Sequence, residues 1–282
     1  MFPIGLSSCA TDDIFALIAQ CAQAGVCCME LSMHTDELAE LDFAALRDCA
    51  KQHGVRLWSM HIPFSPFDVL DPSDPEKQET TLAYFTDYIT KGADIGIDKF
   101  VIHPSAEPIE EEDRPRRMAC AKDSFAYLAD FAAQKGGVIA VENLPRTCLG
   151  RDSKDILDLL SAHPALRVCY DTNHLLSEPA ADFLAAVGDK IITTHVSDYD
   201  FLNERHWLPG EGKVNWQEIL FMLSACGYKG AWLYELGFGM SKTRKRQRVL
   251  TADDVVCNAN ELFAGKTPTL LSEPVEGLQG WK

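Results

Sequence analysis

The sequence predicts a single-domain α/β barrel in which eight parallel strands alternate with eight helices. Apolar, strand-like runs and amphipathic stretches follow one another along the chain, a pattern typical of βα units and a parallel sheet. Six of the apolar runs end in a histidine, an aspartate or a glutamate. Such side chains converge when parallel strands close into a barrel, because the active site of a barrel lies at the carboxyl ends of its strands.

The domain organisation follows from length and from the absence of a linker. The 282 residues fit one barrel, which typically needs about 250 residues, and no segment rich in Pro, Gly or Ser interrupts the alternation. We therefore expect one barrel domain over residues 1–264 and a C-terminal tail over 265–282. The tail contains Gly and Pro without periodicity, and a neighbouring subunit of a homo-oligomer is one surface that it could contact.

In the first half of the chain, recognisable residues begin or end the helices. Thr11, Asp12 and Asp13 are good N-terminal residues for the first helix. Gly54 and the pair Gly136-Gly137 are good C-terminal stops. We expect strands over residues 2–6, 25–31, 55–61 and 99–103, and helices from 11–13 onward and over 43–53, 76–92 and 114–134.

The second half repeats the alternation with short apolar runs that each end in an acid or a histidine. We expect strands over residues 137–142, 166–171, 191–195 and 231–235, and helices over 153–160, 180–187, 216–226 and 252–263. A PGEG turn at 209–212 reverses the chain before the helix at 216–226.

Composition excludes several classes of protein. The net charge of −16 disfavours nucleic-acid binding, since such proteins normally carry a basic face. No stretch approaches the roughly 18 apolar residues of a membrane span, and residues 1–10 lack the basic and long apolar regions of a signal peptide. The ten cysteines contain no CxxC pair, so we interpret them as free thiols of a reducing compartment and expect a cytoplasmic protein.

One basic run departs from the acidic composition. It contains Lys242, Arg244, Lys245, Arg246 and Arg248, a few residues after the last expected strand. The simpler interpretation is a solvated helix face or a subunit contact. The alternative is an anchor for a phosphate or sugar acid, because barrels often bind phosphate near their last two loops.

Four strand-end residues form the main candidate site. Glu142, Asp171, His195 and Glu235 supply three carboxylates and one imidazole, a set that suits Mn²⁺, Mg²⁺ or Co²⁺ and that Zn²⁺ also accepts. Buried carboxylates repel one another and raise each other's pKa unless a cation compensates them. The sequence therefore predicts one divalent metal ion bound by these four residues.

Other polar groups are expected near the same end of the barrel. The candidates for substrate binding or for a second metal are His61, His103, His174, Glu204, Arg205 and His206. Asp198 lies in the same long loop as the last three. On the expected loops, the aromatic residues that would set the size of a pocket are Phe64, Phe67, Trp207 and Phe238. The remaining histidines, His34, His53 and His163, fall on loops or helix ends and are expected at the surface.

Short motifs give the chain a family resemblance over about residues 1–263. The segments SMHIPF, IHPS, VENLP, YDTNHLL, THVSDYD, LPGEGKVNW and YEL resemble the xylose isomerase-like TIM barrel superfamily. That superfamily contains the sugar phosphate isomerase/epimerase family, the ketose 3-epimerases and endonuclease IV. In the epimerases a Glu, an Asp, a His and a second Glu bind one divalent ion, which implies these roles for Glu142, Asp171, His195 and Glu235. The resemblance also implies that Glu142 and Glu235 are the catalytic acid/base pair.

The resemblance implies a metal-dependent isomerase or epimerase of a small sugar, sugar phosphate or related polyol. One glutamate would remove a proton next to a carbonyl, the metal would stabilise the enediolate, and the other glutamate would return a proton. The alternatives are a multi-zinc hydrolase or nuclease of the endonuclease IV type, a barrel dehydratase or lyase, and a non-catalytic barrel that acts as a ligand sensor. Where endonuclease IV has Asp-x-His, this chain has Glu204-Arg205-His206. We expect a small carbohydrate as the partner, with no nucleic acid and no membrane.

Overall fold

Eight parallel strands form the barrel in the computed structural model, which describes residues 1–64, 69–278 and 280. The strands are hydrogen-bonded in the order β7-β6-β5-β4-β3-β2-β1-β8. Their bounds are β1 (Ile4–Ser7), β2 (Cys28–Leu31), β3 (Arg56–His61), β4 (Lys99–Ile102), β5 (Val138–Glu142), β6 (Arg167–Asp171), β7 (Ile191–His195) and β8 (Trp232–Tyr234). Beyond the end of β7, Val196 N donates to Leu233 O at 2.8 Å and Glu235 N donates to Val196 O at 3.2 Å. These bonds join β7 to β8, and the expected barrel is confirmed.

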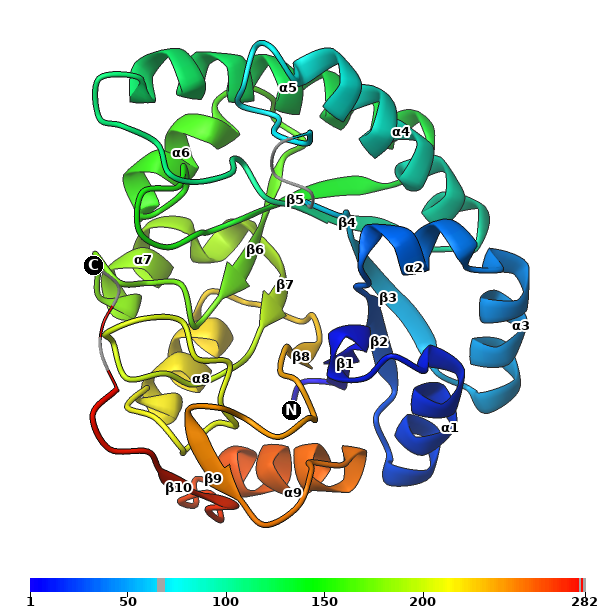
Figure 1. Cartoon of the computed structure of the whole chain (residues 1–282), viewed down its shortest axis with the longest axis vertical. Helices are drawn as coiled ribbons and strands as arrows, with labels where there is room; N and C mark the ends of the chain where they lie inside the picture. The colour runs from blue at the N-terminus through cyan, green and yellow to red at the C-terminus, as the bar shows by residue number, and fades with distance from the viewer. Residues whose placement is uncertain (65–68, 279, 281–282) are drawn as a thin grey trace.

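Helices surround the strands on the outside of the barrel (Figure 1). They are α1 (Ile14–Ala24), α2 (Thr35–Glu40), α3 (Phe43–His53), α4 (Gln78–Asp94), α5 (Arg114–Gln134), α6 (Ser153–Leu160), α7 (Ala180–Val187), α8 (Trp216–Ala225) and α9 (Ala252–Phe263). Two 3₁₀ turns, η1 (Ser8–Ala10) and η2 (Gly188–Lys190), lie beside β1 and β7. The main hydrophobic core joins the outer faces of the strands to these helices.

Several helices begin or end at the capping residues and glycines expected from the sequence. Asp13 accepts a hydrogen bond from Ala16 N, and Asp42 accepts one from Ala45 N, each at 2.9 Å. Gly54 follows α3 with a φ of 69°, a left-handed conformation that favours glycine. The short helix α2 was not expected, and its N-cap is His34 rather than one of the common capping residues.

Two β-bulges set which side chains enter the barrel. The pairing of β2 with β3 shifts by one residue after Met29, so that Glu30 lies opposite Ser59. The pairing of β6 with β7 also shifts, so that Cys169 lies opposite Thr193. A bulge inserts one residue, and a one-residue change of register reverses the face of every later side chain. The bulges therefore direct the last residues of β3 and β7 into the barrel interior.

The basic run forms a strand and not a helix face, which corrects that part of the expectation. β9 (Arg244–Arg246) pairs antiparallel with β10 (Ser272–Pro274) of the tail. Arg244 donates to Glu211 O at 2.8 Å, and Arg246 forms an ion pair with the Glu211 carboxylate. Because Glu211 belongs to the PGEG turn, the run ties the tail to that turn of the same chain. Among the described residues, the run contributes none to the central cavity.

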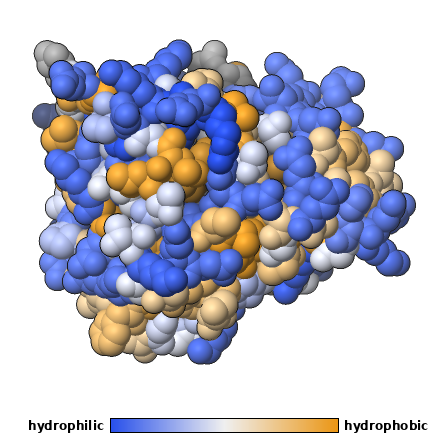
Figure 2. Space-filling model, turned by 90° about the horizontal axis from the view of Figure 1, so that it is seen from below, coloured by the Kyte–Doolittle hydropathy of each residue, from blue (hydrophilic) through white to orange (hydrophobic). Residues whose placement is uncertain are grey.

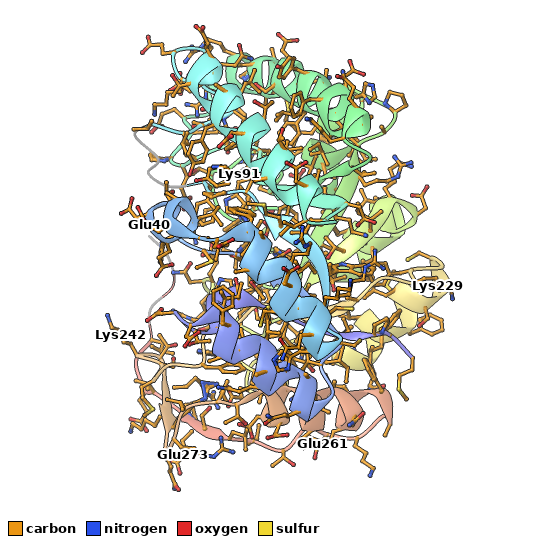
Figure 3. The ribbon with its side chains drawn as sticks, turned by 90° about the vertical axis from the view of Figure 1, so that its right-hand side faces the viewer. Glu40, Lys91, Lys229, Lys242, Glu261 and Glu273 are labelled. Carbon is orange, nitrogen blue, oxygen red and sulfur yellow. The ribbon has the colours of Figure 1, made fainter. Side chains whose placement is uncertain are left out.

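The views of the surface and of the side chains show the polarity of the exterior and the direction of the strands. The face shown in Figure 2 is largely hydrophilic, with separate hydrophobic patches. In the side view of Figure 3, Lys242, after β8, and Lys229, before β8, lie at opposite edges of the molecule. The carboxyl ends of the strands therefore lie on the side of Lys242. In the part of the chain that the structure describes, no helix is long and apolar enough to cross a membrane.

Candidate functional site

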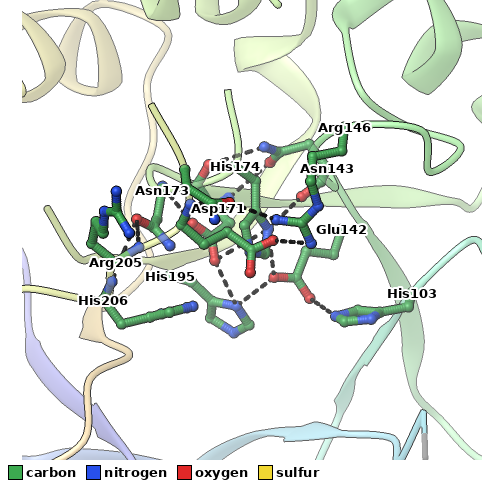
Figure 4. Close-up of polar contacts among 12 residues, drawn as sticks. His103, Glu142, Asn143, Arg146, Asp171, Asn173, His174, His195, Arg205 and His206 are labelled. Carbon is green, nitrogen blue, oxygen red and sulfur yellow. Dashed lines mark hydrogen bonds and ion pairs between the residues drawn. The ribbon is translucent and has the colours of Figure 1, made fainter. Parts of the chain in front are cut away.

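The four strand-end residues come together at the carboxyl end of the barrel. One ligand atom from each of Glu142, Asp171, His195 and Glu235 can be chosen so that all lie within 4.8 Å of one another. The first three are the last residues of β5, β6 and β7, and Glu235 follows the last residue of β8. Figure 4 shows Glu142, Asp171 and His195 directed toward a common point. One ion can contact atoms this close together.

Asn143 holds two of these strands in alignment. Its side-chain amide donates to Asp171 O at 2.9 Å, and its side-chain oxygen accepts from Asp171 N at 2.8 Å. The side chain thus continues the β5–β6 pairing beyond the last residue of β5. This contact fixes the backbone that carries Asp171 next to Glu142.

Glu142 lies among four imidazoles. One carboxylate oxygen is 3.0 Å from His61 Nε2 and 3.2 Å from His103 Nε2. The other is 2.9 Å from His195 Nδ1 and 3.6 Å from His174 Nδ1. Burial alone would raise the pKa of Glu142, but His195 and His103 hold that pKa well below its usual range. Glu142 is therefore an ionised, fully buried carboxylate.

The other two carboxylates, those of Asp171 and Glu235, indicate whether the electrostatics of the site suit a metal ion. Asp171 is fully buried, and its Oδ2 has no hydrogen-bond partner among the described residues. Burial and the charges of Glu235 and Glu142 raise the pKa of Asp171 well above its ordinary value. Burial would also raise the pKa of Glu235, but His195 lowers it. A divalent cation would satisfy the unpartnered oxygen and compensate the crowded carboxylates, so these residues fit a metal ion.

The additional histidines lie around the same point. Two of the further groups of three whose ligand atoms lie within 4.8 Å of one another contain these histidines, namely His61 with His103 and Glu142, and His174 with Glu204 and His206. His61 Nδ1 lies 3.0 Å from Ile62 O, and His174 Nδ1 lies 2.9 Å from Asn143 O. Each of these rings is thus held by a backbone carbonyl on one side. Burial lowers the pKa of His174, which favours its neutral form.

His206 is held by a strained loop. Its φ is 48°, a left-handed conformation that is uncommon for a residue with a side chain and that occurs often at functional sites. The Asn173 side-chain oxygen accepts hydrogen bonds from Arg205 N at 3.0 Å and from His206 N at 3.5 Å. His206 Nδ1 lies 3.7 Å from Glu235 Oε2. The loop therefore returns His206 to the site.

Not every residue predicted for the site lies in it. The Arg205 guanidinium contacts Asp200 at 2.9 Å, and Arg205 does not line the cavity among the described residues. Asp198 accepts hydrogen bonds within its own loop, from Tyr199 N, Gly210 N, Val214 N and Trp216 Nε1.

Of the described aromatic residues that were expected to set the size of the pocket, one lines the cavity and the others do not. Phe64 lines the cavity, with its ring centroid 4.2 Å from that of His103. Trp207 and Phe238 are buried and do not line the cavity among the described residues. Phe67 lies outside the described residues.

The histidines expected at the surface differ in exposure. His34 and His53 are exposed, before α2 and at the end of α3, whereas His163 is half-buried after α6.

A cavity of about 200 Å³ opens beside the four residues, two of which, Glu142 and Glu235, line it. Its lining includes His61, Phe64, His103, Glu107, Glu142, Arg146, His174, Glu204, His206 and Glu235. Sequence reasoning missed Glu107 and Arg146. Arg146 follows the VENLP segment in a loop, and no local pattern connects it with its partners in two other loops.

Arg146 joins three loops at the rim of the cavity. Its Nε lies 3.0 Å and 3.1 Å from the two Glu107 oxygens, and its Nη2 lies 2.8 Å from Glu204 Oε1. Its Nη1 donates to Asn203 Oδ1 at 3.0 Å. Two carboxylates thus face one guanidinium, so this part of the rim has an excess of negative charge.

Comparison with known protein families supports the fold independently. A family model described as xylose isomerase-like TIM barrel matches residues 18–251. Fructoselysine 3-epimerase of Escherichia coli O157:H7 is 28% identical over 120 residues, which cover 40% of this chain and 44% of that protein. An uncharacterised protein of Methanocaldococcus jannaschii is 25% identical over 180 residues, or 60% of this chain and 61% of that one. The matches thus span about half the length of these curated relatives.

Solved structures resemble the whole chain. A D-tagatose 3-epimerase-like protein has a TM-score of 0.80 at 20% identity, with 93% of this chain and 97% of that chain covered. A D-psicose 3-epimerase in the presence of D-fructose has a TM-score of 0.75 at 18% identity, with 94% and 98% covered. At these identities the likeness establishes the fold.

Proposed function

The chain belongs to the xylose isomerase-like TIM barrel family, and we propose that it is a metal-dependent epimerase or isomerase of a small sugar. The observation that carries the proposal is the convergence of Glu142, Asp171, His195 and Glu235 within 4.8 Å in a buried, acidic site. Additional support comes from the sequence match to fructoselysine 3-epimerase and from the structural likeness to proteins described as ketose 3-epimerases.

In this proposal the four residues hold one divalent ion. The ion would stabilise the negative charge that develops on the oxygens of the sugar when a proton leaves the neighbouring carbon. Three carboxylates and one imidazole accept several ions, with Mn²⁺, Mg²⁺, Co²⁺ and Zn²⁺ as the candidates. The buried, unpartnered Asp171 Oδ2 supports this assignment.

Glu142 and Glu235 would move the proton. Both line the cavity, and both have pKa values below the usual range despite burial, because His195 stabilises their charged forms. One carboxylate takes the proton from one face of the carbon, and the other, when protonated, returns a proton to the opposite face. This exchange inverts the carbon, whereas return of the proton to the former carbonyl carbon would instead transfer the carbonyl to the carbon that lost the proton.

The remaining polar lining would bind the hydroxyl groups of the sugar. His61, His103, His174 and His206 line the cavity, and imidazole nitrogens can form hydrogen bonds with hydroxyl groups. The rim cluster of Glu107, Arg146 and Glu204 has an excess of negative charge. We therefore favour a sugar without a phosphate group, because phosphate would approach two carboxylates and an arginine that already faces them.

The direct test is proton exchange at carbon. Wild-type protein loaded with Mn²⁺ or Co²⁺ is incubated with a panel of ketoses in deuterated water, and deuterium incorporation is followed by NMR. We expect incorporation into one ketose, and a loss of at least about 100-fold in Glu142→Gln and Glu235→Gln. Near-normal exchange in either variant would exclude the two-glutamate mechanism.

A multi-metal hydrolase is the second candidate, because a specific observation favours it. Besides the central group, His61, His103 and Glu142 form one set with metal-ligand spacing, and His174, Glu204 and His206 form another. Two or more adjacent ions would suit hydrolysis of a phosphate ester. The net charge of −16 opposes a DNA substrate. Efficient cleavage of a duplex with an abasic site by the zinc-loaded protein would place this candidate first.

A further inference from the structure

Glu30 is a buried carboxylate that the proposed chemistry does not use. It lies on β2 with no exposed surface. Among the described residues, it belongs neither to the groups with metal-ligand spacing nor to the lining of the cavity. A buried carboxylate is costly unless other groups compensate it, so the contacts of Glu30 indicate what it does.

Both oxygens of Glu30 face polar atoms inside the barrel. Oε2 accepts a hydrogen bond from Ser59 Oγ at 2.7 Å, and the bulge in the β2–β3 pairing puts Ser59 opposite Glu30. Oε1 lies 2.9 Å from His195 Nε2, on the far side of the barrel. The two atoms are in close contact but not aligned as a hydrogen bond, and in the described part of the chain neither of these buried atoms has a hydrogen-bond partner.

The His195 ring therefore lies between Glu30 and the proposed metal site. Its Nδ1 lies 2.9 Å from Glu142 Oε1 and 3.5 Å from Glu235 Oε2. A proton on Nε2, directed at Glu30, leaves the lone pair of Nδ1 available to a cation. Metal-binding histidines commonly direct their second nitrogen at a carboxylate, which fixes the orientation and the tautomer of the ring.

We propose that Glu30, held by Ser59, is a positioning residue that orients His195 and increases the affinity of the site for its divalent ion. This inference rests on the proposed metal site and not on the identity of the sugar. This role also accounts for the bulge in the β2–β3 pairing. The shifted register places Ser59 opposite Glu30, where its hydroxyl holds the Glu30 carboxylate.

The experiment measures Co²⁺ binding to the full chain in the absence of sugar. Glu30→Gln keeps the shape of the side chain and removes its charge, and Ser59→Ala removes the hydroxyl that holds it. We expect a loss of Co²⁺ affinity of about 10- to 100-fold for Glu30→Gln, with a shifted Co²⁺ absorption band. A smaller loss in the same direction is expected for Ser59→Ala.

Two matched controls separate positioning from stability. Glu211→Gln removes another buried, paired carboxylate, whose partner is Arg246. Ser124→Ala removes another buried hydroxyl, which donates to Pro72 O at 2.6 Å. Both controls can lower the melting temperature, but they should leave the Co²⁺ affinity and the absorption band unchanged.

Each outcome decides the proposal. Wild-type affinity and an unchanged band in folded Glu30→Gln would overturn it. If that variant does not fold, wild-type affinity and band in Ser59→Ala would overturn it instead. If the wild-type protein binds Co²⁺ but epimerises no sugar, the proposed function fails while the role of Glu30 is still decided. If the wild-type protein binds no divalent ion, both fail.

Discussion

At the scale of single residues, the protonation of the site opposes metal binding. In the ion-free protein, burial and neighbouring carboxylates raise the pKa of Asp171 well above its ordinary value. Burial would lower the pKa of His195, but the surrounding acidic groups raise it well above its ordinary value. Both groups therefore favour their protonated forms, and an ion entering the proposed site would displace those protons. Between the ordinary and the raised pKa values the folded state binds more protons than the unfolded state, so these two groups stabilise the ion-free protein less as the pH rises.

A pH dependence of metal affinity follows. We expect the affinity for Mn²⁺ to increase as the pH rises through the neutral range, with release of protons on binding. Calorimetry in buffers of different ionisation enthalpy measures both quantities. In Asp171→Asn, which has no titratable carboxyl at this position, fewer protons should be released by any ion that still binds. An affinity independent of pH, with no proton release, would contradict the description of the site.

The rim cluster predicts discrimination against phosphate. Glu107 and Glu204 both contact Arg146. A phosphate group on the substrate would meet their negative charges, and like charges about 4 Å apart near a protein surface repel by up to about 4 kcal/mol. We expect kcat/KM for a free ketose to exceed that for its terminal phosphate by about 10-fold or more. Glu107→Gln should narrow this ratio. The control Glu111→Gln, whose partner Arg151 lies 2.6 Å away outside the cavity, should leave it unchanged. A preference of the wild-type protein for the phosphate would contradict this assignment.

At the scale of elements, Asp198 organises the loop between β7 and α8. It is fully buried and accepts hydrogen bonds from Gly210 N at 2.7 Å, Trp216 Nε1 at 2.9 Å and Val214 N at 3.1 Å. Asp198→Ala leaves these buried donors without an acceptor, so we expect a loss of about 3 kcal/mol or more in the free energy of unfolding. Denaturant unfolding measures this loss.

Control substitutions distinguish this structural role from a role in metal binding. Asp189→Ala removes an exposed carboxylate that contacts Lys190, and its effect on stability should lie within about 0.5 kcal/mol. Folded Asp198→Ala should still bind as many metal ions per chain as the wild-type protein. Loss of the ion in a stable Asp198→Ala would show that Asp198 belongs to the metal site.

The elements that the sequence predicted best are those with local signals. Residues 43–53 form a helix with the expected bounds, because an aspartate precedes it and Gly54 follows it. The short helix α2 has His34 at its N-cap, and no common capping residue indicates where it begins. The basic run at 242–248 was expected on a solvated helix face, in a subunit contact or as an anchor for a phosphate or sugar acid. It forms β9 because its strand partner lies in the tail, far along the chain, where no local pattern connects the two.

The same distinction applies to the site. Glu142, Asp171 and His195 were predictable because each is the last residue of a buried strand. Glu30 was not, since Leu31 follows it within β2 and its partner His195 comes from across the barrel. Arg146 lies in a loop, and its contacts with Glu107 and Glu204 depend on how three loops fold over the barrel. Strand periodicity predicts a residue's face, but not its distant partners.

At the scale of the whole molecule, one barrel brings together side chains that are far apart in the sequence. Residues from β2, β3, β5, β6 and β7 contact one another inside it, and Glu235 joins them directly after β8. The tail pairs with β9 of the same chain, so at least this part of it is covered without a neighbouring subunit. The net charge of −16 fits a small, uncharged substrate better than a nucleic acid.

The number of metal ions per chain tests the central claim most directly. Wild-type protein is loaded with Mn²⁺ or Co²⁺, desalted and measured by elemental analysis beside Asp171→Asn and the surface control Asp189→Asn. We predict one ion per chain in the wild-type protein and in the control, and a large loss in Asp171→Asn, because Asp171 is one of four ligands in the proposed site. The absence of any bound ion from the wild-type protein, or full retention of the ion by Asp171→Asn, would contradict the account.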